Sequence, residues 1–192
     1  AEAEPVFREV LELRRQKLGQ EHPLTINSLR SHATQLRDLG RYSEAEPLFR
    51  EVLELTRKVL GPNHPNVIDA LKGVGIAIML SNGDEQAEPF FQEALDLSRE
   101  VLGPDNENTF KELLNYAEIL FRSGKHTEAA SMCKEVLDCT RKVHAPVQPQ
   151  TLMALNVYVS TLNRIEINAE LCKEALELIR REFRTDKIHL LQ

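Results

Sequence analysis

A repeat with a period of 42 residues constrains this sequence more than any other feature. The stretch 3–13 returns with few changes at 45–55 and 87–97, and a weaker copy begins at Ala129. A second motif, Leu-Gly-x-x-His-Pro, occurs in phase at 18–23 and 60–65, with a variant at 102–107. A third element is a leucine at each of four equivalent positions, Leu29, Leu71, Leu113 and Leu155. Three elements in register indicate an array of similar units.

Each unit is predicted to contain two helices. In 45–60 the apolar residues Leu48, Phe49, Val52 and Leu53 follow the helical period, and Gly61 and Pro62 end the pattern. The stretch 25–39 is the expected partner helix, and Gly40 marks the turn between the two.

The start of the second helix of each unit is predicted from proline and hydroxyl residues. Pro47 and Pro89 are expected in the first turn, where a missing N–H costs little. Ser43 and Thr127 lie where they could cap the second helices of their units.

A helix–turn–helix unit cannot bury its apolar face alone, but stacked units can. We therefore expect an all-α fold, an α–α superhelix of about four and a half repeats, cut inside a unit and so a piece of a longer array. Recurrent Gly and Pro limit each helix to roughly 15 residues, which argues against a coiled coil. The expected division is an orphan second helix at 1–18, repeats at 24–60, 66–102 and 108–143, a degenerate repeat at 150–183, and a tail or further helix at 184–192.

Composition narrows the function. The chain has 30 acidic and 24 basic residues, a balance that argues against a nucleic-acid partner. No apolar run approaches the ~20 residues of a membrane span, so no membrane partner is expected. Three scattered cysteines fit a reducing, cytoplasmic location, with Cys133 and Cys172 as small buried side chains.

No motif predicts chemistry, so we expect no enzymatic activity, no cofactor and no metal site. Gly73 and Gly75 are better explained by close helix packing than by a dinucleotide-binding loop, because a third glycine and a preceding strand are missing. His22 and His64 are interpreted as part of the linker motif, since both precede a proline in the same repeated element.

The repeat resembles the tetratricopeptide repeat (TPR). The residues that match its packing signature in the first complete unit are Leu29, Ala33, Leu36, Gly40, Tyr42, Ala45, Phe49 and Val52. The usual repeat has ~34 residues, whereas this one has a long second helix and a linker that resemble the repeats of kinesin light chains. The fourth unit is three residues shorter and lacks the turn glycine.

The resemblance implies that the first helices of successive units line a concave, peptide-binding groove. The residues expected there are Asn27, Arg30, Thr34, Arg37, Asp69, Lys72, Ile76, Met79, Lys111, Leu114, Asn115, Glu118, Phe121, Arg122 and Asn156. Five of them are cationic and two anionic, so the groove is expected to be net positive. Asn115 and Asn156 match a position at which related proteins grip peptide backbone.

Two functions remain open at this point. The first is a non-catalytic scaffold that binds a partner protein or peptide with acidic and apolar residues in the groove. The alternative is a structural or self-associating array fragment of a larger multidomain protein, including a homo-oligomer joined through unpaired terminal helices. The groove residues could also be an ordinary solvated helix face.

Overall fold

The computed structural model describes residues 4–81 and 83–142, and these ranges contain seven α-helices and no strand. The prediction of an all-α fold is confirmed. The helices are α1 (Glu4–Leu18), α2 (Pro23–Asp38), α3 (Tyr42–Leu60), α4 (Pro65–Ser81), α5 (Asp84–Val101), α6 (Glu107–Arg122) and α7 (His126–Lys142). The fourth helix pair and the tail expected at 150–192 lie outside the described residues.

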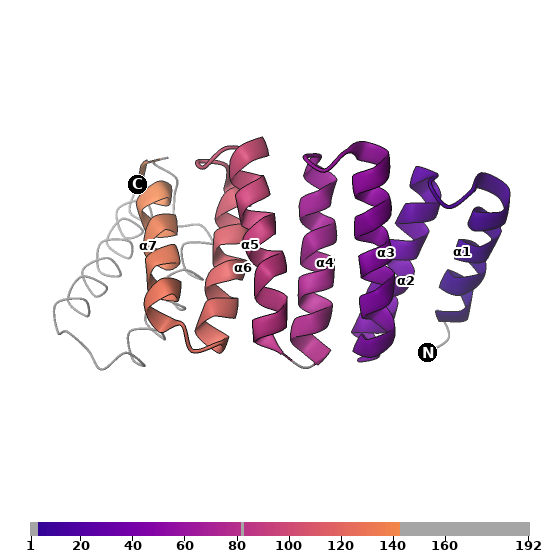
Figure 1. The fold of residues 1–192 in the computed structure, drawn as a ribbon, viewed down its shortest axis with the longest axis horizontal. Coiled ribbons are helices and arrows are strands. Elements are labelled where there is room, and N and C mark those ends of the chain that lie inside the picture. The colour runs from indigo at the N-terminus through magenta and orange to yellow at the C-terminus, as the bar shows by residue number, and fades with distance from the viewer. Residues whose placement is uncertain (1–3, 82, 143–192) are drawn as a thin grey trace, which may run out of the picture. The chain divides into compact units, whose positions relative to one another are not determined.

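The chain divides into two compact units, Ala1–Leu102 with α1 to α5 and Gly103–Gln192 with α6 and α7. Within unit 1 each helix packs against the next one in the sequence, and short connections alternate between the two ends of the row (Figure 1). Within unit 2, α6 packs against α7. This is the nearest-neighbour packing expected of stacked helical repeats.

The 42-residue period is a period of buried positions. The recurring leucines of the first helices and the recurring alanines of the second helices are at most 1% exposed: Leu29, Leu71, Leu113, Ala45, Ala87 and Ala129. An alanine side chain lets two helix backbones approach closely, while leucine fills the space beside it. The repeated sequence motif is therefore the core of the fold.

Two glycines of α4 lie directly against aromatic rings of the neighbouring helices. A Cβ placed on Gly73 would lie 2.6 Å from Cδ1 of Phe49 in α3. A Cβ on Gly75 would lie 2.8 Å from Cε2 of Phe91 in α5. Both rings are 3% exposed, so they have little room to move. The interpretation of these glycines as close packing positions is confirmed, and each receives one aromatic ring.

Gly73→Ala should therefore destabilise the chain by about 1–3 kcal/mol, because overpacking outweighs the better helix propensity of alanine. Chemical denaturation monitored by circular dichroism measures the change. In a Phe49→Leu background, which removes the ring, the same substitution should cost much less. An equal cost in both backgrounds would show that the Phe49 ring does not set the requirement for glycine.

The turns of the α2–α3 and α6–α7 pairs each contain a glycine with positive φ. At Gly40 (φ 76°) the N–H of Gly40 donates to O of Arg37 and that of Arg41 to O of Leu36, both at 2.9 Å. Gly124 (φ 80°) repeats the same pair of bonds with Phe121 and Leu120. These are Schellman motifs, which satisfy the last carbonyls of a helix and reverse the chain.

The linker histidines cap the helices that follow them. Nδ1 of His22 accepts a hydrogen bond from the N–H of Leu24 at 3.2 Å, and Nδ1 of His64 accepts one from Asn66 at 3.1 Å. At the equivalent position before α6, Oδ1 of Asn106 accepts from the N–H of Asn108 at 2.9 Å. The repeated His-Pro pair is thus a cap followed by a proline at the helix start, where no N–H is needed.

His64→Ala should cost about 1 kcal/mol of stability, because an N–H at the start of α4 loses its acceptor. His64→Asn should keep the stability, since Asn106 already makes the same contact in this chain. Thermal unfolding of the two variants checks this. Equal losses for alanine and asparagine would contradict the capping role.

The predicted starts of the second helices were wrong. Helix α3 begins at Tyr42 and α5 at Asp84, so Pro47 and Pro89 lie inside their helices and not in the first turn. Ser43 lies within α3, whose N-cap is Arg41 with no side-chain cap bond, and Thr127 lies within α7. For α3 the reason is the tight Schellman turn, which leaves only Arg41 between Gly40 and the helix.

Candidate binding groove

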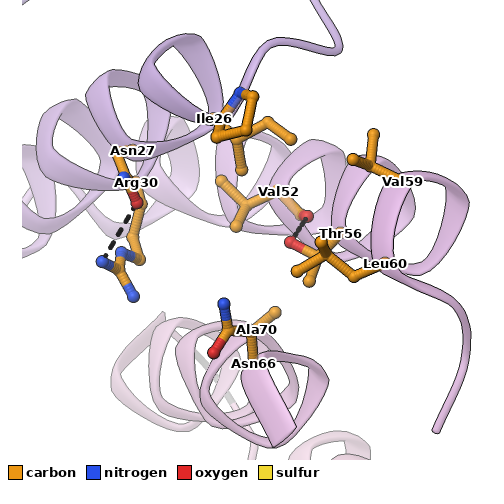
Figure 2. A pocket seen from close by; sticks show the side chains of 10 residues that line it. Ile26, Asn27, Arg30, Val52, Thr56, Val59, Leu60, Asn66 and Ala70 are labelled. Atoms are coloured by element: carbon orange, nitrogen blue, oxygen red, sulfur yellow. Dashed lines mark hydrogen bonds between the residues drawn. The ribbon is translucent and has the colours of Figure 1, made fainter. Parts of the chain in front are cut away.

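Unit 1 contains a pocket of about 90 Å³ between α2 and α4, with α3 as its floor. Figure 2 shows the lining side chains converging from these three helices. The lining residues are Pro23, Ile26, Asn27, Arg30, Val52, Thr56, Val59, Leu60, Asn66 and Ala70. The pocket includes two of the predicted groove residues, Asn27 and Arg30.

The floor of this pocket is mostly apolar, and its one hydroxyl group is hydrogen-bonded within α3. Val52 is 2% exposed, and the buried hydroxyl of Thr56 donates to the carbonyl of Val52 at 2.6 Å. The other polar side chains are those of Asn27, Arg30 and Asn66, which are exposed and come from α2 and α4. Since liquid water occupies ~30 Å³ per molecule, the volume is large enough for a small or medium apolar side chain.

Arg30 is the charged residue of the pocket. Its Nη2 donates to Oδ1 of Asn27 at 3.3 Å, and its side chain extends from α2 into the space between α2 and α4 (Figure 2). Across residues 4–81 and 83–142 no carboxylate pairs with this guanidinium. Arg30 therefore keeps a full charge and free donors beside an apolar floor.

The other predicted groove residues of unit 1 form ion pairs with neighbouring side chains or are half-buried. Arg37 pairs with Asp38 at 3.0 Å, and Lys72 pairs with Asp69 at 3.0 Å. Thr34, Ile76 and Met79 are half-buried. The structure thus gathers Asn27 and Arg30 at the pocket, while the remaining residues lie elsewhere on α2 and α4.

In unit 2 the predicted groove residues on α6 differ in exposure. Lys111, Glu118 and Arg122 are exposed, and Lys111 pairs with Glu107 at 3.4 Å. Phe121 and Asn115 are half-buried.

Two of these α6 residues contact other side chains, and a third is buried. Asn115 donates to Glu112 at 3.1 Å, and the Phe121 ring lies 5.2 Å from that of His126. Leu114 is only 5% exposed, so it is a core residue with little side-chain surface for a ligand. Asn156 lies outside the described residues.

The charge of the predicted groove is lower than the sequence suggested. Arg37 and Lys111 pair with Asp38 and Glu107, two acidic residues that the predicted set does not contain. Adding them leaves five cations against four anions. Exposed pairs of this kind contribute little to stability, but they reduce the field that a ligand meets.

Sequence reasoning missed most of the pocket lining. Val59 and Leu60 belong to the second helix of the unit, and the family geometry assigns the groove to first helices. Asn66 follows the linker proline and carries no motif of its own. A signal was nevertheless present, since Val59 and Leu60 continue the apolar pattern to the end of α3.

The described residues provide no evident reactive centre. Within 4–81 and 83–142 there is no group of three or more His, Cys, Asp and Glu residues that could hold a metal ion. Cys133 is fully buried and free, and burial raises the pKa of its thiol to about 12. His22 and His64 act as helix caps. Among the helices that the structure describes, none is long and apolar enough to cross a membrane.

Cys133 should consequently be unreactive in the folded chain. At pH 8, a pKa of about 12 in place of the ordinary 9 lowers the thiolate fraction, and with it the alkylation rate, by about a thousandfold. Iodoacetamide labelling followed by peptide mass mapping measures the rate at Cys133. Denaturant should restore ordinary reactivity, and rapid labelling of the native chain would contradict the burial.

Comparison with known families agrees with the packing pattern. The tetratricopeptide repeat matches residues 1–24, 25–66, 79–108 and 113–150, which together make up more than half of the chain. The chain belongs to the tetratricopeptide repeat family. The predicted resemblance is therefore confirmed, and the fold is a TPR solenoid.

Solved structures of similar shape include kinesin-light-chain-type proteins. A candidate kinesin light chain from Podosopora anserina with nearly identical TPR-like repeats is 18% identical, with a TM-score of 0.82 over 100% of this chain and 88% of that one. BtubC (BKLC) from P. vanneervenii is also 18% identical, with a TM-score of 0.79 over 98% of this chain and 73% of its own. MamA protein is 13% identical, with a TM-score of 0.60 over 97% and 93%. No protein with a curated description matches the sequence.

At these identities the structural likeness shows the fold alone. TPR arrays generally mediate protein–protein interactions and are typically non-catalytic scaffolds.

Proposed function

We propose that this chain is a non-catalytic scaffold whose groove between α2 and α4 binds a partner peptide with acidic and apolar side chains. The observation that carries the proposal is Arg30, a guanidinium without a carboxylate partner in the described chain, beside an apolar floor. An apolar side chain of the partner would enter the pocket, and an adjacent carboxylate would pair with Arg30.

The remaining groove residues would act in a supporting role. Exposed amides at Asn27 and Asn66 offer donors and acceptors to a peptide backbone on either side of the pocket. Lys72 and Lys111 would attract an acidic segment only weakly, because each has an acidic neighbour on its own helix. The free thiol of Cys133 is consistent with activity in the cytoplasm.

A random peptide library displayed on phage and selected on the folded chain tests this function. Selected peptides should combine Asp or Glu with a nearby apolar residue. Arg30→Glu should weaken them about five- to tenfold, mainly through slower association, and the loss should shrink at high salt. Asn27→Trp, which places a ring at the pocket, should also weaken binding.

A matched control is available on α1. Arg8→Glu makes the same change of charge at a side chain that is 62% exposed and not part of the pocket. This variant should bind the selected peptides as the parent does. Peptides that bind Arg30→Glu and Asn27→Trp as tightly as the parent would place the recognition surface elsewhere and refute the proposal.

The alternative function, a structural or self-associating array in a larger protein, is favoured by a separate observation. Helix α1 exposes large apolar side chains on one face. That face does not include any residue of the pocket, so the two roles are compatible.

A further inference from the structure

The pocket between α2 and α4 has a floor of buried side chains. Val52 is 2%, Thr56 4% and Ala70 3% exposed. Side chains in a packed interior have little freedom to move, so the floor has a fixed shape. The Thr56 hydroxyl donates to the carbonyl oxygen of Val52 at 2.6 Å, within its own helix (Figure 2). Because its one O–H proton is used there, Thr56 offers the pocket a methyl group and no donor.

Aliphatic side chains also form the sides of the pocket. Ile26 and Val59 are half-buried, and Leu60 is 41% exposed. An apolar group that enters this space is favoured because it leaves water, whereas a polar group would lose hydrogen bonds to water and find none in return. The interior therefore favours an apolar side chain, while the exposed Arg30 favours a carboxylate next to it.

The volume of the pocket limits which apolar side chains fit. It is about 90 Å³, whereas an apolar cavity known to hold a benzene ring in another protein measures about 150 Å³. The side chains of valine, leucine and isoleucine are smaller than a benzene ring. A phenyl or indole ring would remain partly outside the pocket, so its apolar surface would be buried incompletely.

The repeat shows what a longer side chain does at the position of Thr56. Arg14 of α1 lies one repeat period before Thr56, and Ser28 of α2 lies one period before Ala70. Nη1 of Arg14 donates to Oγ of Ser28 at 2.7 Å and to the carbonyl oxygen of Leu24 at 3.0 Å. A long side chain at this position thus bridges to the next first helix. Thr56 and Ala70 are too short to do so, which leaves the pocket open.

We propose that this pocket binds an aliphatic side chain of the partner, such as that of valine, leucine or isoleucine, in preference to an aromatic one, and that the short Thr56 side chain sets this selectivity. The inference rests on the proposed peptide function. It narrows the partner to a segment in which an acidic residue accompanies an aliphatic residue.

A peptide series on the unmodified chain tests the size limit. The tightest peptide from the phage selection is synthesised with Ala, Val, Leu, Phe or Trp at its most alanine-sensitive apolar position, and isothermal titration calorimetry measures each dissociation constant. The better of Val and Leu should bind at least about tenfold more tightly than Ala, and about tenfold more tightly than Phe or Trp. Equal or tighter binding of Phe or Trp overturns the selectivity.

Three substitutions of Thr56 test whether this residue sets the limit. Thr56→Leu extends a side chain into the pocket and should weaken the aliphatic peptide at least about tenfold. Thr56→Val is the matched control, because it keeps the shape and the methyl group and removes only the hydroxyl, so it should bind as the parent does. Thr56→Ala enlarges the pocket and should reduce the preference for Leu over Phe.

Circular dichroism checks that each variant is folded. If Thr56→Leu does not fold, the Thr56→Ala comparison and the peptide series on the unmodified chain decide the question. An unchanged preference for Leu over Phe in Thr56→Ala would show that Thr56 does not set the selectivity.

These outcomes separate the selectivity from the proposed function. Peptides that bind Arg30→Glu and Asn27→Trp as tightly as the parent, or a selection that yields no acidic and apolar peptide, overturn both. Peptides that depend on Arg30 but bind equally well with Phe, or bind folded Thr56→Leu as tightly as the parent, leave the function standing and overturn the selectivity.

Discussion

The structure depends on one packing arrangement, in which a helix inside the array contacts both the preceding and the following helix. In unit 1, α2, α3 and α4 each pack against the helix before and the helix after, which a single apolar stripe could not support. Helix α4 is the extreme case, because it receives the Phe49 ring at Gly73 and the Phe91 ring at Gly75. The close approach of backbone to ring leaves no room for even one methyl group, so the positions of α3, α4 and α5 are tied to one another.

The same requirement relates the pocket to the open face of α1. Where a first helix covers a second helix fully, as over Val52, the apolar surface becomes core with a small pocket at its edge. On α1 the equivalent residue, Val10, is 36% exposed. The chain therefore presents two surfaces of different kind, a pocket beside Arg30 between α2 and α4 and an apolar stripe on α1.

Ion pairs accompany this packing. Ion pairs join successive second helices at equivalent positions, Arg15 to Glu51 and Arg57 to Glu93, so the repeat holds charge partners as well as apolar ones. On the first helices the predicted cations are mostly neutralised by residues one to four positions away, such as Asp38 beside Arg37 and Glu107 beside Lys111. Arg30 differs because its side-chain partner is the neutral Asn27.

The sequence by itself determined the fold, because the leucine and alanine positions that form the core recur every 42 residues. Leu29, Ala45, Gly40 and the linker histidines each have a physical role that a periodic pattern displays. It did not determine the starts of α3 and α5, which depend on how tightly the chain turns after the preceding helix, nor which of fifteen groove candidates would line a pocket.

Those features were decided by tertiary structure. Val59 and Leu60 line the pocket from the second helix, whereas Leu114 is buried in the core. Asp38 and Glu107 form ion pairs with cations that the sequence analysis expected to bind a ligand. The physical reason is that periodicity shows which side of a helix is apolar. Only the packed neighbours decide how much of that side remains open and which charges meet.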